Sequence, residues 1–186
     1  MFGTHLSDVY AGRVFSQAAT PLGLAIPIYT ATAIAGGMPI WNPPNSNVRV
    51  ELISVDIGYG SGTADFGSIG LMCRRLDAIA TGEIMTALAE TTPDNGFLFG
   101  GNRSKVKSSN AGTCTVTAGV AADWKRTLFS INLEAQTGTA HASQPCHYNF
   151  DGTVVIPPGV LVYLAATKAT VALYASCVVW KEIAIS

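Results

Sequence analysis

Hydrophobic and polar residues alternate along short stretches of this chain. In VRVELISVDIG, which begins at Val48, apolar residues hold every second position as far as Leu52, with polar residues between them. This is the alternation of a half-buried β-strand. The apolar series then changes parity and continues at Ile53, Val55 and Ile57. The change predicts a β-bulge near Leu52–Ile53.

Similar stretches, divided by Gly and Pro residues, run along the whole chain. Helical periods are scarce: only LDAIATGEIMTALAE (76–90) is compatible with a short amphipathic helix, and Gly82 interrupts it. Many short strands with turn signals between them are typical of an all-β sandwich or barrel. The predicted strands lie near Ala25–Tyr29, Pro39–Trp41, Asn47–Gly58, Phe66–Arg75, Thr113–Thr117, Trp124–Glu134, Thr153–Ile156, Val160–Ala166 and Thr170–Ile183.

The final two of these strands are the most apolar. They follow Pro157 and Pro158, which cannot sit in the middle of a sheet. Both faces of Val171–Trp180 are apolar, without a charge. A strand that is apolar on both faces is covered on both sides. We therefore predict that both strands are central, each covered by the sandwich core and by a neighbouring subunit or an overlying loop, with Trp180 in the core or at a subunit boundary.

The composition points to buried surface. A chain of 186 residues suits one domain. Charged residues make up 12%, about half of the roughly 25% that is usual. Such a surface is poorly solvated unless part of it is buried between subunits, so we expect a homo-oligomer, a trimer in preference to a dimer. The net charge of −1 favours neither nucleic acid nor a membrane as a partner.

The longest uncharged stretch, between Arg13 and Arg49, is broken by prolines and glycines, so we expect no transmembrane helix. The start of the sequence lacks a basic region followed by an apolar one, so no secretory signal is predicted. The four cysteines are widely spaced without a C-x-x-C pair, and we expect reduced thiols, with Cys177 as a small core residue.

The candidate chemical residues are few. HASQPCH places His141, Cys146 and His147 within seven residues, but the spacing matches no closed zinc site. We interpret this stretch as a polar loop before a strand and predict no metal and no cofactor. The chain contains no hydrolase, metalloprotease, P-loop or dinucleotide-binding motif, so we predict that it is not an enzyme.

A basic loop, GGNRSKVKSSNAG (100–112), carries Arg103, Lys105 and Lys107 and no aromatic residue. It is either a solvated loop tip or a surface that forms salt bridges with an acidic partner. A nucleic-acid surface normally adds stacking side chains or more charge.

Two motifs together suggest a family. Trp41-Asn42-Pro43 leads into a long strand, and Pro158-Gly159 leads into two strands that end in Trp180-Lys181-Glu182. This order resembles that of small β-sandwich structural proteins of tailed bacteriophages, in particular capsid cement or decoration proteins. The resemblance implies a jelly-roll-like antiparallel β-sandwich in the virion, made in the host cytoplasm. It also implies binding of dimers or trimers to the major capsid protein on the outside of the phage head.

The first residues have scattered apolar positions and no clear period. Residues 1–23 are predicted to be an extended N-terminal arm that lies on another protein, or a frayed terminus followed by an edge strand, and residues 24–186 form the sandwich domain. Large apolar anchors commonly dominate interface energy. The candidate interface residues are Phe2, Leu6, Tyr10, Phe15, Arg103, Lys105, Lys107 and Trp180.

Two alternatives remain. One is a carbohydrate- or receptor-binding head-fibre or tail module, since jelly rolls also host lectins. It needs exposed aromatic platforms, for which Trp41, Trp124 and Tyr148 are the candidates. The other is a cupin-like enzyme, which needs a histidine cluster that three scattered histidines do not supply.

Overall fold

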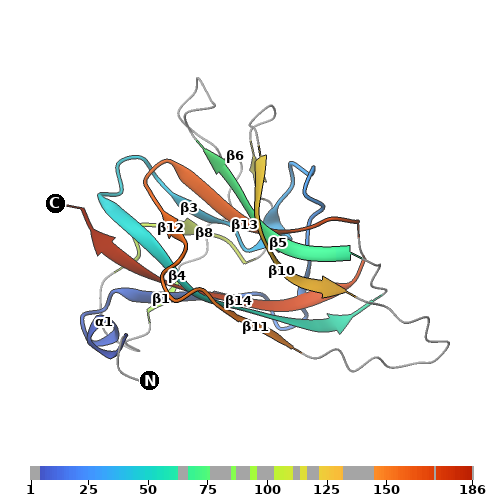
Figure 1. The fold of residues 1–186 in the computed structure, drawn as a ribbon, viewed down its shortest axis with the longest axis horizontal. Coiled ribbons are helices and arrows are strands. Elements are labelled where there is room, and N and C mark those ends of the chain that lie inside the picture. Colours follow the sequence, from blue (N-terminus) through green and yellow to red (C-terminus); the bar gives the residue numbers. More distant parts are fainter. Residues whose placement is uncertain are drawn as a thin grey trace.

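The computed structural model describes residues 5–62, 67–75, 85–86, 93–95, 103–110, 114–116, 122–131, 145–169 and 171–185. These residues form two main antiparallel sheets that pack face to face, so the predicted all-β sandwich is confirmed (Figure 1). The elements are α1 (Leu6–Tyr10), β1 (Val14–Ala18), β2 (Leu24–Ala25), η1 (Ala35–Gly37), β3 (Ile40–Asn42), β4 (Val48–Ser61), β5 (Gly67–Arg75), β6 (Met85–Thr86), β7 (Asp94–Asn95), β8 (Lys107–Ser108), β9 (Thr115–Val116), β10 (Ala122–Ile131), β11 (Cys146–Asn149), β12 (Val155–Ile156), β13 (Val160–Ala166) and β14 (Leu173–Ala184).

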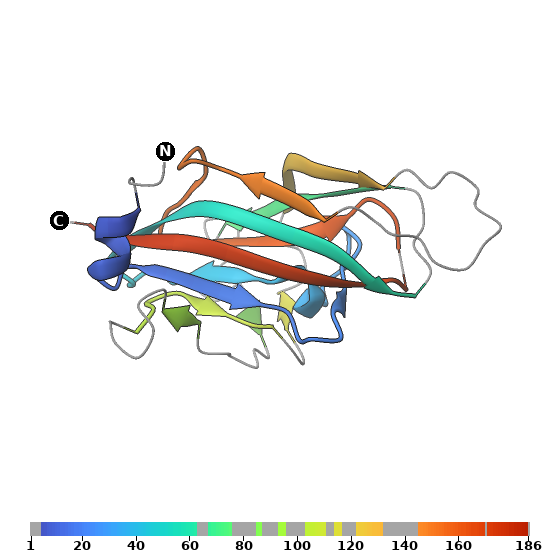
Figure 2. The same ribbon diagram turned by 90° about the horizontal axis from the view of Figure 1, so that it is seen from below.

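Each main sheet is built around one of the two most apolar strands. The first sheet has the order β11-β4-β14-β1-β7, with β12 also pairing with β4 and β2 with β14; the second has the order β10-β5-β13-β3-β8. Strand β14 is therefore the middle of one sheet, between β4 and β1, and β13 is the middle of the other (Figure 2). The prediction that these two strands are central is confirmed.

Strand β4 carries the bulge predicted from its change of parity. Its register with β14 shifts between Val179 and Trp180, which leaves Ile53 as an extra residue in β4. Leu52 before the bulge and Val55 after it are both buried in the main core. Without the extra residue, one of the two apolar series would face away from the core.

The main core lies between the inner faces of the two sheets. Trp180 is completely buried there, and its ring stacks on that of Phe15 with 6.2 Å between the centroids. Phe15 is only 2% exposed, so its predicted role as an anchor on another protein is wrong: its ring fills the core of its own sandwich. For Trp180, the core is one of the two positions predicted, and burial there excludes it as an interface side chain.

Strand β13 is covered on both faces. Val162 and Leu164 point into the main core, whereas Leu161 and Tyr163 belong to a second apolar cluster on the opposite face. That second cluster includes residues from connecting segments, among them Ile34 and Cys114, which are joined by a backbone hydrogen bond of 2.8 Å. An overlying loop, one of the two covers predicted, thus buries the outer face of β13.

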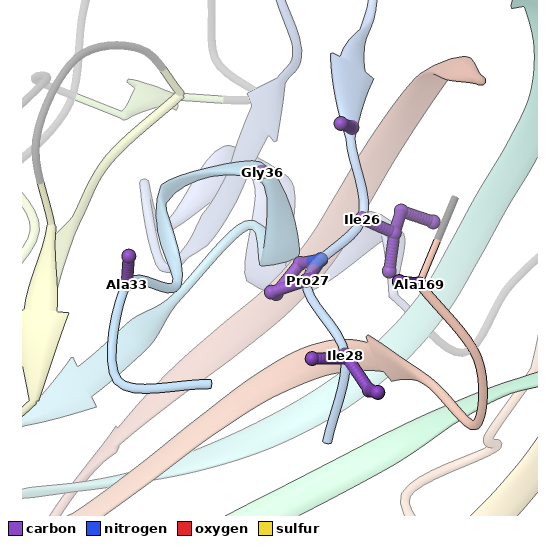
Figure 3. A pocket seen from close by; sticks show the side chains of 7 residues that line it. Ile26, Pro27, Ile28, Ala33, Gly36 and Ala169 are labelled. Atoms are coloured by element: carbon purple, nitrogen blue, oxygen red, sulfur yellow. The ribbon is translucent and has the colours of Figure 1, made fainter. Parts of the chain in front are cut away.

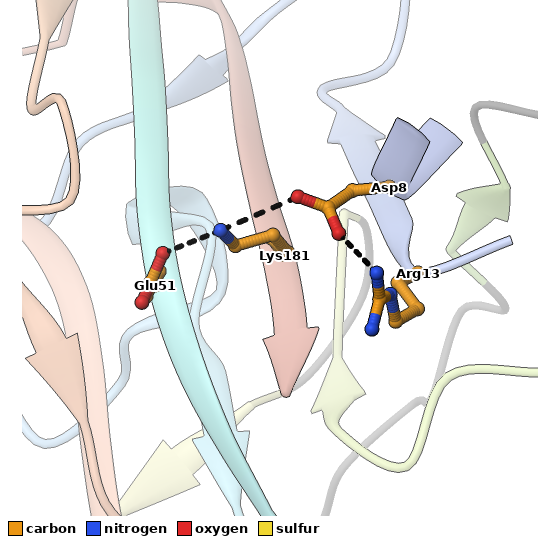
Figure 4. Close-up of polar contacts among 4 residues, drawn as sticks. All are labelled: Asp8, Arg13, Glu51 and Lys181. Carbon is orange, nitrogen blue, oxygen red and sulfur yellow. Dashed lines mark hydrogen bonds and ion pairs between the residues drawn. The ribbon is translucent and has the colours of Figure 1, made fainter. Parts of the chain in front are cut away.

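The outer face of β14 is only partly covered by the described residues. Ala175 is exposed, and Cys177 and Val179 are half-buried. The interpretation of Cys177 as a core residue is wrong, because the alternation of the strand turns its side chain away from the core. At the C-terminal end of β14, α1 lies over this face (Figure 4).

Residues 5–23 do not form an extended arm. Residues 6–10 form α1, and Val14–Ala18 pairs along its whole length with β14, from Val14 opposite Lys181 to Ala18 opposite Cys177. Of the two alternatives for this segment, the strand is observed, but it is not an edge strand, because Phe15 and Ser16 also pair with β7. Phe2 lies outside the described residues.

Two further expectations need correction. The sequence predicts that HASQPCH is a polar loop before a strand, but its last two residues already begin β11, which pairs with β4 over Cys146–Asn149. Polar residues occupy this strand because its outer face meets solvent, with His147 and Asn149 exposed. In the segment open to a helical interpretation, the described residues Met85–Thr86 are strand β6, paired with β9.

Candidate functional site: the α1 end of the sandwich

An ion network ties α1 to the first sheet. Lys181 Nζ lies 2.8 Å from Glu51 Oε2 and 3.4 Å from Asp8 Oδ2, and Arg13 Nη2 lies 2.5 Å from Asp8 Oδ1 (Figure 4). The side chains of Lys181 and Asp8 are 15% and 13% exposed. The hydrogen bond to Glu51 raises the pKa of Lys181, and the charges of Glu51 and Asp8 raise it further against the effect of burial. The network therefore holds α1 from its polar side.

The apolar side of α1 faces solvent. Leu6 is 54% exposed and Tyr10 69% exposed, and no residue of this helix is buried. Residues four apart on a helix are neighbours on its surface, so these two side chains lie on one side. A short helix that turns Asp8 toward the protein and Leu6 and Tyr10 outward has the orientation of a contact element.

A buried carboxylate holds the basic loop against the other side of β14. Glu182, 6% exposed, accepts hydrogen bonds from Ser104 Oγ at 2.5 Å, from the backbone N–H of Lys105 at 3.0 Å and from Trp180 Nε1 at 3.3 Å. Three donors around one carboxylate compensate for the loss of its hydration. In the Trp-x-Glu motif, Glu182 therefore anchors the basic loop to β14.

The described part of the basic loop, Arg103–Asn110, is therefore not a solvated tip. Val106 is 4% exposed, and the hydroxyl of Ser108 donates to Gln17 Oε1 of β1 at 2.8 Å with both side chains buried. Exposure alternates along the segment, with Arg103 and Lys105 exposed and Lys107 half-buried in β8. The inward-pointing side chains of Val106 and Ser108 hold the segment in place, and the side chains of Arg103 and Lys105 point to solvent.

The histidine and cysteine candidates do not converge. His147 Nδ1 lies 2.6 Å from Asp56 Oδ1 on the outer face, whereas Cys146 points inward, with Sγ 3.8 Å from the carbonyl oxygen of Leu128. Burial raises the pKa of the Cys146 thiol, and the charge of Asp56 adds to this effect. His141 lies outside the described residues. In the part of the chain that is described, no three metal-ligating side chains gather at one place.

A groove lies beside β2 and η1. It has a volume of about 320 Å³ and is open to solvent (Figure 3). Its walls offer no side chain that can transfer a proton, act as a nucleophile or bind a metal, since they are formed by Ala25, Ile26, Pro27, Ile28, Ala33, Gly36 and Ala169.

The aromatic residues predicted as a sugar-binding platform pack against other side chains of the protein. Trp41 is 3% exposed and belongs to the second apolar cluster, so it cannot stack on a sugar. Trp124 packs against the same cluster, and Tyr148 packs against Phe150 with 4.9 Å between the ring centroids. Both are half-buried.

The motifs that carry the family resemblance meet in the fold. Asn42 is completely buried, and its Nδ2 donates to the carbonyl oxygens of Val48 and Ile156 at 3.0 Å each. The backbone oxygen of Asn42 accepts a hydrogen bond from the N–H of Gly159 at 2.8 Å. Gly159 has φ +82°, which favours glycine. The Trp-Asn-Pro and Pro-Pro-Gly segments thus lock together the turns before β4 and β13.

Sequence patterns identified part of this site. Leu6, Tyr10, Arg103 and Lys105 are candidates that the structure leaves exposed at one end, whereas Glu182 gave no signal beyond its place in the Trp-x-Glu motif. Comparison with protein-family models, curated proteins and solved structures finds no match for this chain. Among the described residues, no helix has the length and apolar character to cross a membrane.

Proposed function

We propose that this chain is a structural virion protein, a capsid cement or decoration protein that binds the outside of a phage head and stabilises it through protein–protein contacts. The observation that carries the proposal is α1, which is held by ion pairs and presents Leu6 and Tyr10 to solvent. Exposed aromatic and aliphatic side chains on a fixed element are typical anchors for a pocket on a partner.

The contact between the two family motifs also supports the proposal. Asn42 and Gly159 belong to segments more than a hundred residues apart, yet their backbones are hydrogen-bonded. The segments that carry the resemblance therefore act together in holding the turns before β4 and β13. A jelly-roll-like connection of the strands is part of the proposal.

Self-association is also part of the proposal. The low charge content and the partly covered outer face of β14 favour a homo-oligomer, a trimer in preference to a dimer, with the major capsid protein as the other partner. No catalytic step, metal, cofactor, nucleic acid or membrane is involved. Light scattering at micromolar concentration is expected to show the oligomer, and a stable, soluble monomer would count against it.

The direct test is imaging of assembled particles. Heads of the phage that encodes the chain, assembled without it, are incubated with the purified protein and imaged by electron cryomicroscopy. We expect density on the head exterior at symmetry or pseudo-symmetry axes, and retention of the genome at higher temperature. Density on a tail or fibre would support the receptor-binding alternative, and no density on the particle would refute both.

Matched variants locate the contact. Leu6→Ser together with Tyr10→Ser is expected to lower the occupancy of the protein on heads at unchanged stability, because neither side chain is buried in the free protein. Leu22→Ser is the control, since Leu22 is 81% exposed and lies in the turn before β2. Equal losses in the control and the double variant would show that α1 is not the contact.

A further inference from the structure

Two neighbouring residues of β14 hold two different surface elements at one end of the sandwich. Lys181 pairs with Asp8 of α1, while Glu182 accepts hydrogen bonds from Ser104 and Lys105. Successive side chains of a strand point to opposite faces, so α1 and the basic segment, Arg103–Lys107, flank the same end of β14. Figure 2 shows α1 and the strand at the end of this segment on one side of the molecule.

This end combines apolar anchors with cations. Leu6 and Tyr10 are exposed on α1, and Arg103 and Lys105 are exposed on the basic segment. Neither Arg103 nor Lys105 forms an ion pair with any side chain in the described ranges. We propose that this end is a single docking surface for a partner protein that carries a cluster of carboxylates beside an apolar pocket.

The composition of the surface favours a protein partner. Protein interfaces commonly have an apolar centre with aromatic and Arg residues and a polar rim. A nucleic-acid surface normally needs more positive charge than the three cations of the basic segment, and it adds stacking side chains, which this segment lacks. Anionic membranes are typically recognised by clusters of four to eight cations, whereas the basic segment carries three.

Glu182 is the positioning residue of this surface. It fixes the Ser104 hydroxyl and the Lys105 amide, while Ser108 is fixed separately through Gln17. A segment that is already held in its bound conformation loses less conformational entropy when it binds. The cations are therefore presented in one arrangement before a partner arrives.

The charge half of the proposal is tested with a fluorescent hexaglutamate peptide at low ionic strength, since exposed charges are screened within about 8–10 Å in ordinary buffers. The native protein is expected to bind it with an affinity that falls as salt rises. Arg103→Glu with Lys105→Glu is expected to lower the affinity by about tenfold or more. Lys168→Glu is the control, because Lys168 is exposed in the turn at the opposite end of β14.

Three outcomes would overturn the charge half. One is the absence of salt-dependent binding by the native protein. Another is an equal loss of affinity in Lys168→Glu. The third is tighter binding of a single-stranded oligonucleotide or of anionic vesicles of phosphatidylglycerol than of the peptide, which would assign a different class of partner.

The positioning half uses Glu182→Ala, which keeps every cation of the basic segment. Faster hydrogen exchange at the Lys105 amide and a several-fold lower peptide affinity are expected, with partial rescue in Glu182→Gln, whose amide oxygen still accepts a hydrogen bond. Ser104→Ala, which removes only one of the donors, serves if Glu182→Ala fails to fold. Faster exchange with unchanged peptide affinity would refute the positioning role.

The inference deepens the proposed function and rests on it for the partner's identity as a capsid protein. The two fail separately. If the peptide binds as expected but the protein is absent from imaged particles, the docking surface stands and the virion proposal falls. If the variant with Arg103→Glu and Lys105→Glu decorates heads as well as the native protein does, the virion proposal stands and the docking surface falls.

Discussion

Replacing Asn42 with Asp tests the contact that joins the turns before β4 and β13. The side chain of Asn42 is completely buried, and Nδ2 donates to the carbonyl oxygens of Val48 and Ile156. An ionised aspartate has nearly the same shape but no N–H. It removes both hydrogen bonds and turns a carboxylate oxygen toward two carbonyl oxygens.

The magnitude follows from the two acceptors. Each hydrogen bond contributes about 0.5–1.5 kcal/mol net, and the Val48 carbonyl oxygen still has Ser46 Oγ at 3.4 Å, so Asn42→Ala is expected to cost about 1–3 kcal/mol in the free energy of unfolding. Asn42→Asp adds a buried, unpaired charge, which raises the pKa of the introduced carboxyl above its usual value near 3.9. A typical domain is stable by about 5–15 kcal/mol, so either loss is large.

The sign of the pH dependence separates the two variants. Because the carboxyl of Asn42→Asp has a higher pKa in the folded than in the unfolded state, its excess cost over Asn42→Ala is full above the folded pKa. This excess shrinks as pH falls toward the unfolded value. Protonation also supplies one O–H donor for one of the carbonyls. Asn42→Ala has no carboxyl and lacks this recovery.

The assay is urea unfolding followed by tryptophan fluorescence at pH 7 and pH 5. Asn149→Asp is the control, because Asn149 is exposed on β11 and uses only its oxygen, as an acceptor for the Asp151 amide. The control is expected to lie within about 0.5 kcal/mol of the native protein. If Asn42→Asp matches the control at pH 7, Asn42 does not act as a buried donor.

Four further predictions follow. Trp180→Ala removes a fully buried ring and is expected to cost about 3–5 kcal/mol in denaturant unfolding, whereas a loss below about 1 kcal/mol would contradict its central place. Deleting Val171–Ser186 removes the middle strand of one sheet, so the shortened chain is expected to show no cooperative unfolding; a soluble, cooperatively folded product would refute this. Lys181→Met removes the stability that the charged Lys181 contributes, which is full below pH 10.5, the usual lysine pKa. The native protein loses this stability as pH rises through the raised pKa of Lys181. Plots of unfolding free energy against pH for the two proteins are therefore expected to converge in strong alkali. Burial raises the pKa of the Cys114 thiol to about 12, so its labelling by a thiol reagent at pH 8 is expected to follow global unfolding, and rapid labelling of the folded protein would contradict this.

The parts of the fold that the sequence predicted are those in which one strand carries its own signal. The parity change in β4 marks the bulge at Ile53, and the two-sided apolar pattern marks β13 and β14 as central. These signals are local, because alternation depends only on which residues of one strand meet the core.

Features that depend on distant partners gave no such signal. Strand β1 is short and places Gln17 on its inner face, where Ser108 satisfies it, so its pattern does not resemble a core strand. Glu182 is a charged residue that ordinary rules place in solvent, and two of its three hydrogen-bond donors lie more than seventy residues earlier. Strand β11 looks like a loop because solvent meets its outer face.

Pairing of the earliest strand with a much later one has a consequence during synthesis. Strand β7 pairs only with Phe15 and Ser16, and the neighbour that pairs with the whole of β1 is β14, in which Trp180, opposite Phe15, comes about 165 residues later. At roughly 5–20 residues per second, that delay is roughly 8–30 seconds on the ribosome. Throughout this interval β1 has one unpaired edge, and β1 and β4 lack the strand that lies between them in the first sheet. The chain is therefore expected to complete its fold only after β14 has been made, and to need protection from aggregation until then.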